Sequence, residues 1–209
     1  MTGIKIKYYF LIILLITGCT NPFDVRSPES PDNQSLTAVF DAPTSPRIVL
    51  TNFARAIEQK NVQKYLENFT NSNMQNITPF HFEPEKNLFD YFVPVWTFED
   101  EGNYFINLLQ TGKVNYPVIK FNYADSVSLT AINASAIDDS VESNYFRYTL
   151  EINFGDSVSV YQGRAKFKLL RSRTTLDYWY IYFWSDFALD ENYDKTWSFL
   201  KSYYRWSSN

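Results

Sequence analysis

Two side chains in this sequence have the chemistry of a general acid or base. His81, the only histidine, stands between two phenylalanines, and Asp186 follows Trp184 by two residues at the end of an aromatic segment. In an apolar pocket the pKa of either group shifts, so that the group can transfer protons near neutral pH. Each also has a structural interpretation, His81 as a partly buried loop residue after Pro79 and Asp186 as the cap of the following turn.

The acidic run Glu99-Asp100-Glu101 offers further carboxylates. It would supply a general base or a cation ligand, but acids at the start of a helix also favour the positive end of its dipole, by about 0.3–1 kcal/mol each. With one histidine and no carboxylate spacing that matches a known ligand motif, the sequence predicts neither a metal site nor a cofactor. It also has no nucleophile-elbow sequence.

Cys19 is the only cysteine, and it ends the run Leu-Ile-Thr-Gly-Cys directly after a short apolar segment. Lys5 and Lys7 precede an apolar core of about ten residues, whereas a membrane-spanning helix needs roughly twenty. The pattern resembles a bacterial lipobox, which predicts cleavage after residue 18 and acylation of the Cys19 thiol. We therefore expect attachment to a lipid bilayer through acylated Cys19, which leaves no thiol for a disulfide.

The mature chain is predicted to be acidic. The sequence has 19 basic and 23 acidic side chains, and loss of Lys5 and Lys7 leaves 17 basic ones and a net charge near −6. This charge argues against nucleic acid as a partner. Thr20 differs from the aspartate that retains many lipoproteins at the inner membrane. We expect a bacterial cell-envelope protein at the outer membrane, with its body in the periplasm or at the cell surface.

Three segments follow one another along the chain. Residues 1–18 are the predicted lipoprotein signal peptide, and residues 19–44 are the lipidated cysteine and a flexible, proline-rich linker. Residues 45–209 have the length of one domain. Aromatic residues make up 19% of the sequence, which is the composition of a domain with a large aromatic core.

Helices precede strands within this domain. Apolar residues recur at helical spacing after Ser45-Pro46 and after Thr97, and a short helix closes the chain. From residue 114 the period changes to two, which predicts a four-stranded antiparallel meander. Its segments are 117–133, 144–154, 157–171 and 177–187. The sequence therefore predicts an α+β domain with N-terminal helices packed on one face of a curved antiparallel sheet.

The strand expected at residues 178–184 is aromatic on both faces. In strict alternation Tyr180, Tyr182 and Trp184 point one way, and the residues between them point the other. Helices would cover one face. The other would be covered by the linker near Phe40, form a homodimer contact, or serve as a platform for a flat ligand such as a sugar.

Core-type residues form patterns at both ends of the domain. The first pattern is Ser45-Pro46, Val49-Leu50, Phe53, Ala56-Ile57 and Tyr65. The second is Ala165, Phe167, Leu169, Trp179, Ile181, Trp184, Asp186, Trp197, Leu200 and Lys201. The first resembles the opening helices of the NTF2-like (cystatin-like cone) superfamily. The second is similar to a group of uncharacterised bacterial lipoproteins with that predicted fold.

The resemblance implies a cone-shaped domain. Enzymes of the superfamily place a carboxylate or a histidine inside the cone, which would make Asp186 or His81 the catalytic group of an isomerase- or dehydratase-like enzyme. Such an enzyme needs an open apolar cavity, whereas Trp96, Tyr148 or Trp184 would plug the cone. We expect a non-catalytic binding or scaffolding module for a small ligand, a glycan or an envelope protein, with the enzyme as the alternative.

Asp-Ser-Val occurs three times, at residues 125–127, 139–141 and 156–158. The triplet resembles the acceptor that some bacteria O-glycosylate on exported proteins, which would place glycans on Ser126, Ser140 and Ser157. It is equally a pair of turn residues that opens a strand.

Overall fold

The computed structural model describes residues 39–93, 95–111, 115, 117–123, 127–132, 139–173 and 176–205. Its helices are α2 (Pro46–Glu58), α3 (Val62–Leu66), α4 (Phe98–Gln110) and α5 (Trp197–Tyr204), with 3-10 turns η1 (Lys86–Phe92) and η2 (Tyr193–Lys195). Its strands are β1 (His81–Glu83), β2 (Val118–Tyr123), β3 (Leu129–Ala131), β4 (Ser140–Ser143), β5 (Phe146–Asn153), β6 (Val158–Arg171) and β7 (Trp179–Phe187). The predicted α+β class is confirmed.

Helices α2 and α4 begin where the sequence predicts. The Ser45 side chain accepts a hydrogen bond from the Ile48 N–H, and Pro46 occupies the first helical position of α2. Thr97 and Asp100 form a reciprocal capping box at the start of α4. None of the helices that the structure describes is long and apolar enough to cross a membrane.

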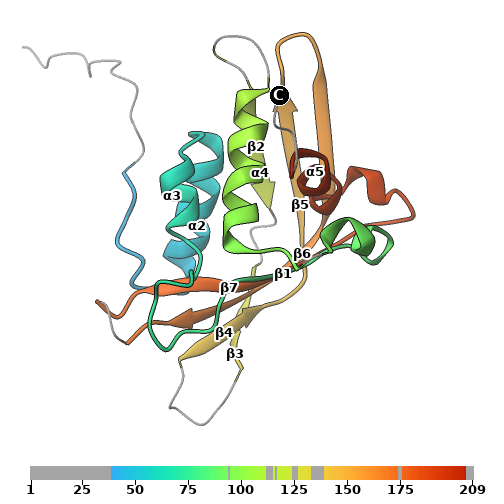
Figure 1. The fold of residues 1–209 in the computed structure, drawn as a ribbon. Helices are drawn as coiled ribbons and strands as arrows, with labels where there is room; N and C mark the ends of the chain where they lie inside the picture. Colours follow the sequence, from blue (N-terminus) through green and yellow to red (C-terminus); the bar gives the residue numbers. More distant parts are fainter. Residues whose placement is uncertain are drawn as a thin grey trace, which may run out of the picture. The chain divides into compact units, whose positions relative to one another are not determined.

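Strand β6 organises the sheet. It pairs with β7 along one edge, and with β5 and then β4 along the other. The described strands follow the order β1-β7-β6-β4-β3, while β5 joins β2 to β6. The helices α2, α3, α4 and α5 lie on one side of the strands β1, β7 and β4 (Figure 1). The side away from the helices is called the outer face below.

The prediction of a four-stranded meander is wrong, because the described residues already form a sheet of seven strands. The predicted segment 117–133 divides into β2 and β3, which pair with different strands, β5 and β4. Strand β1 lies between the helices α3 and α4 in the sequence and pairs in parallel with β7, the last described strand. These missed strands have three or four residues, too few for a period of two to be recognised in the sequence.

A bulge interrupts the pairing of β7. Ile181 pairs with Leu169 and Phe183 pairs with Lys168, so Tyr182 is an extra residue without a partner across the ladder. Ile181 and Trp184, three residues apart, are therefore both fully buried on the helix side. A strand without a bulge would place Tyr182 and Trp184 on the same face. The strict alternation assumed from the sequence therefore does not hold in β7.

The core is built around aromatic rings. Phe53 of α2 has six aromatic neighbours whose ring centroids lie 5.5 to 6.0 Å from its own, namely Tyr65, Phe69, Phe121, Phe167, Trp184 and Trp197. Trp184 and Trp197 meet edge to face at 4.8 Å. Helices and sheet therefore share one aromatic interior.

The last residues of the predicted linker pack on the domain. Arg55 Nη1 donates to the Val39 carbonyl at 2.7 Å, and Asn52 Nδ2 donates to the Asp41 carbonyl at 2.7 Å. The Trp179 N–H donates to the Pro43 carbonyl at 2.8 Å. The described segment from residue 39 to residue 44 therefore packs on α2 and on the start of β7, and these contacts do not include the outer face that the linker near Phe40 was expected to cover.

Gly163 in β6 provides a test of this packing. A Cβ at this position would lie 2.6 Å from the Tyr148 hydroxyl oxygen and 2.8 Å from the Phe187 carbonyl oxygen. We expect Gly163→Ala to lower the free energy of unfolding by about 1–3 kcal/mol because the neighbours must move. Urea denaturation measures this change.

Gly102→Ala in α4 is the matched control. Its Cβ would meet a Leu66 methyl group at 3.3 Å, the end of a flexible side chain. Alanine also gains about 1 kcal/mol of helix propensity over glycine, so we expect a net change within about 1 kcal/mol. Equal stability of the two variants would contradict the close approach of β5, β6 and β7 around Gly163.

Candidate functional site

Side chains fill the inside of the cone. Trp96, Tyr148 and Trp184, the aromatics expected to line or plug a pocket, are 1%, 2% and 0% exposed. A hollow among Leu50, Phe53, Phe121, Tyr123, Phe146 and Phe167 measures about 10 Å³. That volume accommodates roughly one water molecule.

Asp186 lies inside the domain and is fully buried. Its Oδ1 accepts from the Tyr148 hydroxyl at 2.6 Å, and its Oδ2 accepts from the Ser198 N–H at 2.5 Å and the Ser198 hydroxyl at 2.6 Å. Burial raises the pKa of Asp186, while the hydrogen bonds from Ser198 and Tyr148 act in the opposite direction. Through Oδ2 Asp186 thus holds the start of α5 against the sheet, and through Oδ1 it bonds Tyr148 of β5.

His81 does not share a site with Asp186. It is exposed on the edge strand β1, where its ring stacks on Phe183 with centroids 5.7 Å apart. Phe183 is the residue paired with His81 across the parallel ladder. The structure therefore places one acid–base candidate inside the domain and the other on its surface.

A buried ion pair occupies the centre of the domain. Lys201 Nζ of α5 lies 2.7 Å from Glu101 Oε2 of α4, and both side chains are 0% exposed. The same Glu101 oxygen accepts from Trp96 Nε1 at 2.7 Å, and its other oxygen accepts from the Tyr65 hydroxyl. Glu101 therefore has three donors from three different parts of the chain.

Aromatic rings complete the surroundings of Lys201. Its Nζ lies 3.5 Å from the ring centroid of Trp184 and 3.7 Å from that of Phe82. Burial lowers the pKa of Lys201 to about 8, although the nearby Glu101 carboxylate favours the charged form. Burial and the same carboxylate raise the pKa of Tyr65. Groups of the same chain thus supply the hydrogen bonds and the opposite charges for Glu101 and Lys201, as expected of a site with a structural role.

Sequence reasoning did not identify the pair of Glu101 and Lys201. Glu101 was interpreted as one of three acids at a helix start, and Lys201 as part of a core pattern. The position of Lys201 could have indicated that it is buried, because Lys201 falls on the apolar stripe of Trp197, Leu200 and Tyr204 at helical spacing. A lysine on such a stripe requires a buried anion, but the sequence does not say which one.

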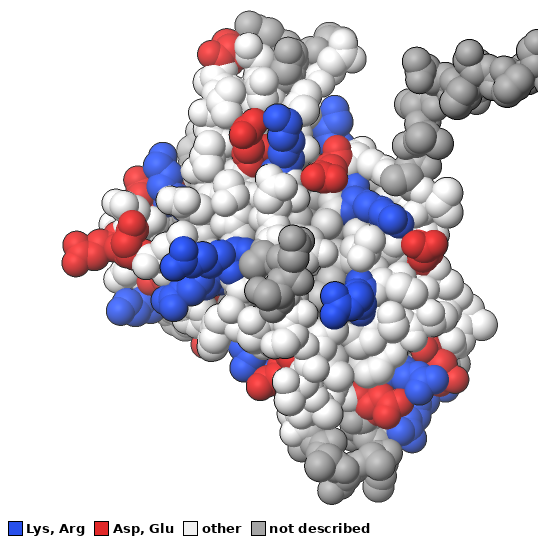
Figure 2. Space-filling view, turned by 180° about the vertical axis from the view of Figure 1, so that it is seen from behind, with Lys and Arg blue, Asp and Glu red and all other residues white. Residues whose placement is uncertain are grey.

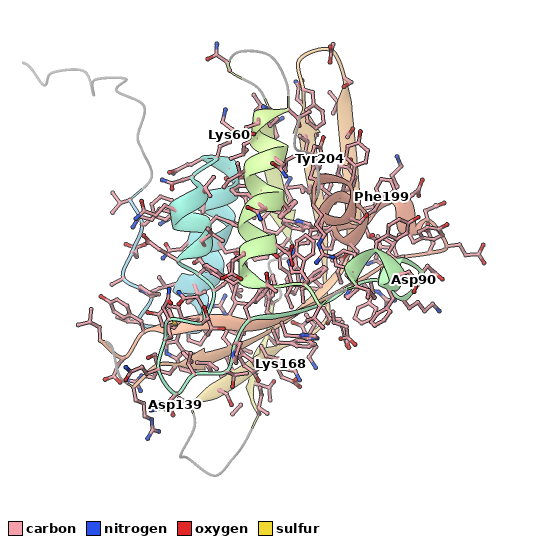
Figure 3. All side chains as sticks on the ribbon, viewed as in Figure 1. Lys60, Asp90, Asp139, Lys168, Phe199 and Tyr204 are labelled. Carbon is pink, nitrogen blue, oxygen red and sulfur yellow. The ribbon has the colours of Figure 1, made fainter. Side chains whose placement is uncertain are left out.

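The outer side of the domain has an open cleft of about 420 Å³. It lies where the loop before β1 meets β4 and the bulged region of β6 and β7, and Figure 3 places Asp139 at this end of the sheet and Lys168 on the outer face. Its lining residues are Gln75, Asn76, Ile77, Thr78, Ile132, Asp139, Ser140, Leu170, Arg171, Ser172, Arg173 and Tyr182. Tyr182 is partly exposed here, whereas Tyr180 is buried.

The predicted modification sites have different surroundings. Ser140 lines this cleft at the start of β4, and Ser157 is exposed in the turn between β5 and β6. Ser126 and Cys19 lie outside the described residues. Among the residues with described positions, no group of three His, Cys, Asp or Glu side chains could hold a metal ion.

Solved structures with the NTF2-like fold resemble this chain. A protein named as a dehydratase of the NTF2-like family, from Streptomyces avermitilis, superposes with a TM-score of 0.51 and 11% identity over 69% of this chain and 93% of its own. An NTF2-like protein from Rhodospirillum rubrum gives a TM-score of 0.49 with 8% identity, over 70% of this chain and 99% of its own.

No family model and no curated protein sequence matches the chain. The likeness to the Streptomyces structure shows an NTF2-like fold and, at 11% identity, the fold alone. The predicted fold type is thereby confirmed.

Removing one partner of the central ion pair is expected to destabilise the domain strongly. Glu101→Gln or Lys201→Met leaves a buried charge without its partner, which costs about 3–5 kcal/mol of unfolding free energy. The double variant should lose less than the sum of the two, by at least about 1 kcal/mol. Urea denaturation of the four proteins measures the coupling.

Lys64→Met is the matched control for this cycle. Lys64 and Glu67 are also 2.7 Å apart, but their side chains are 38% and 47% exposed. We expect a change below about 1 kcal/mol, because water screens this pair. Additive effects of Glu101→Gln and Lys201→Met would contradict an energetically coupled buried pair.

The lowered pKa of Lys201 predicts a pH dependence of stability. Between pH about 8 and the ordinary lysine value of about 10.4, the unfolded chain holds a proton that folded Lys201 has released. The contribution of Lys201 to the free energy of unfolding therefore rises with pH, by up to about 1.4 kcal/mol per unit.

The measurement is the difference in unfolding free energy between wild type and Lys201→Met from pH 7 to 10. The raised pKa values of the buried Tyr65, Tyr104 and Tyr148 lower stability above pH about 10, but this effect is common to both proteins. A difference that stays constant with pH would show that Lys201 has an ordinary pKa.

Proposed function

We propose that this protein is a non-catalytic binding module, held at a bacterial envelope membrane by a lipid on Cys19. The observation that carries this proposal is the packed interior of the described domain, where the hollow bordered by Phe53, Phe121 and Phe167 measures about 10 Å³. A small-molecule site commonly needs about 300–1,000 Å³. Binding is therefore assigned to the outer surface of the domain.

The alternative of an isomerase- or dehydratase-like enzyme has less support. A protein named as a dehydratase shares the fold, but catalysis within this cone would require Asp186 to reach a substrate. Three hydrogen bonds from within the chain occupy Asp186, and its side chain is fully buried. His81 is exposed, but it lies on the edge strand β1 rather than in the cone.

The charges on the described surface favour an uncharged partner. On the face shown in Figure 2, Lys and Arg side chains are interspersed with Asp and Glu. Ion pairs of the described residues include Lys120–Glu151 and Arg171–Asp139. Such a surface lacks the wide basic area that nucleic acids require. Glycans and envelope proteins are the proposed partners, and a homodimer through the outer face is the alternative assembly.

The proposed anchor places the domain near a membrane. Residues 19–38, which precede the packed segment, would reach at most roughly 70 Å when fully extended. The domain could then contact partners within that distance of the bilayer. We assign it to the outer membrane rather than the inner one, with the body in the periplasm or at the cell surface.

Metabolic labelling tests the anchor. We expect the full-length protein, expressed in a bacterial host, to incorporate labelled palmitate, and Cys19→Ser to lose the label because it has no acceptor thiol. Thr20→Ser, which keeps the cysteine and the small residue before it, should be labelled like the wild type. An unlabelled wild-type protein, or label retained by Cys19→Ser, would rule out acylation at this residue.

A further inference from the structure

The bulge in β7 determines how Tyr182 is presented. Tyr182 has no partner across the β6–β7 ladder, and it lines the outer cleft together with Leu170 of β6. Bulges re-aim a side chain and are frequent beside binding sites. Partial burial and the nearby Glu142 raise the pKa of Tyr182, so its phenol is neutral in physiological conditions. The cleft thus contains an accessible, uncharged aromatic ring.

Another part of the lining is polar. Arg171 Nη1 donates to Asp139 Oδ2 at 2.8 Å, and Arg171 Nη2 lies 3.6 Å from Asp177 Oδ2. Two carboxylates therefore orient one planar guanidinium group at the cleft. Hydroxyl and amide groups from the loop before β1, from β4 and from the end of β6 complete the lining; they belong to Gln75, Asn76, Thr78, Ser140 and Ser172.

This combination matches the chemistry of a sugar ring. A pyranose has apolar C–H faces, which pack on aromatic rings, and a rim of hydroxyl groups that both donate and accept hydrogen bonds. A planar carboxylate or guanidinium can bond two neighbouring hydroxyls at once. The cleft volume of about 420 Å³ lies within the range of small-ligand sites.

Other ligand classes fit this cleft less well. An anion would find the charge of Arg171 already balanced by Asp139 and Asp177, so that of the two arginines in the lining Arg173 would be left to bind it. A metal ion would find no group of three suitable side chains among the residues that the structure describes. A lipid chain would contact a lining in which eight of the twelve residues are polar or charged.

We propose that the outer cleft binds a neutral saccharide unit, with Tyr182 as the stacking platform and the Arg171–Asp139 pair as a hydrogen-bonding group for its hydroxyls. This inference rests on the proposed function as a binding module and names its ligand class and site. The cleft lies outside the cone, so saccharide binding does not depend on an opening of the aromatic core.

Isothermal titration calorimetry on the full-length protein tests the proposal, in a detergent without a sugar headgroup. The probes are neutral oligomers of glucose and of N-acetylglucosamine, with adenosine and inorganic phosphate as non-saccharide probes. We expect at least one neutral oligomer to bind, Tyr182→Ala to weaken it about tenfold or more, and Tyr182→Phe to retain it. Arg171→Ala should also weaken binding.

Tyr145→Ala is the control variant, because Tyr145 is 54% exposed and is absent from the cleft lining. It should bind the oligomer like the wild type, and thermal unfolding verifies that each variant is folded. Binding that survives Tyr182→Ala in a folded protein overturns the assignment of the site. Binding of adenosine or phosphate alone, or of no probe, overturns the saccharide class.

These outcomes are separable from failure of the proposed function. Loss of palmitate labelling in the wild type would remove the anchor while leaving the cleft untouched. Turnover of any bound oligomer, detected as altered sugar in the recovered ligand, would instead overturn the non-catalytic assignment while leaving Tyr182 as the binding residue.

Discussion

The buried pair of Glu101 and Lys201 is the interaction on which the rest of the domain depends. Two charges removed from water are tolerated only with good geometry and with hydrogen bonds for the remaining polar atoms. The pair joins α4 to α5, because Lys201 Nζ lies 2.7 Å from Glu101 Oε2. Tyr65 of α3 and Trp96 of the loop before α4 also donate hydrogen bonds to Glu101. A displaced helix would leave a charge unpaired, so the pair selects one arrangement of the helices over other compact ones.

The same arrangement explains why the inside of the cone is closed. Trp184 packs against the Lys201 ammonium group on one side and contacts Phe53 and Trp197 within the core. Asp186, two residues later, holds the start of α5 through Ser198. Asp186 thus connects the sheet to α5, and the Glu101–Lys201 pair connects α4 to α5. The proposed ligand-binding role is therefore assigned to the outer side, where the bulge presents Tyr182.

The features that could be predicted from sequence were local or periodic. Ser45 and Thr97 identify helix starts because capping involves residues within one turn, and the apolar stripe of α2 follows from spacing. Strands β1, β3 and β4 were missed because their short lengths carry no period. The Glu101–Lys201 pair spans 100 residues of sequence, and the bulge at Tyr182 depends on the register of two strands. Both features depend on contacts between segments that are distant in the sequence, so no local or periodic pattern indicates them.

The packed segment from residue 39 to residue 44 has a mechanical consequence. A pull on the chain before residue 39 reaches the domain through hydrogen bonds to Arg55 and Asn52 of α2 and to Trp179, the first residue of β7. Strand β7 pairs with β1 on one edge and with β6 on the other. A force applied at Trp179 therefore acts on a strand that is hydrogen-bonded on both edges. If Cys19 carries the proposed lipid, tension in the tether would act in part on the strand that carries Tyr182, so the force and the proposed saccharide would meet on one structural element.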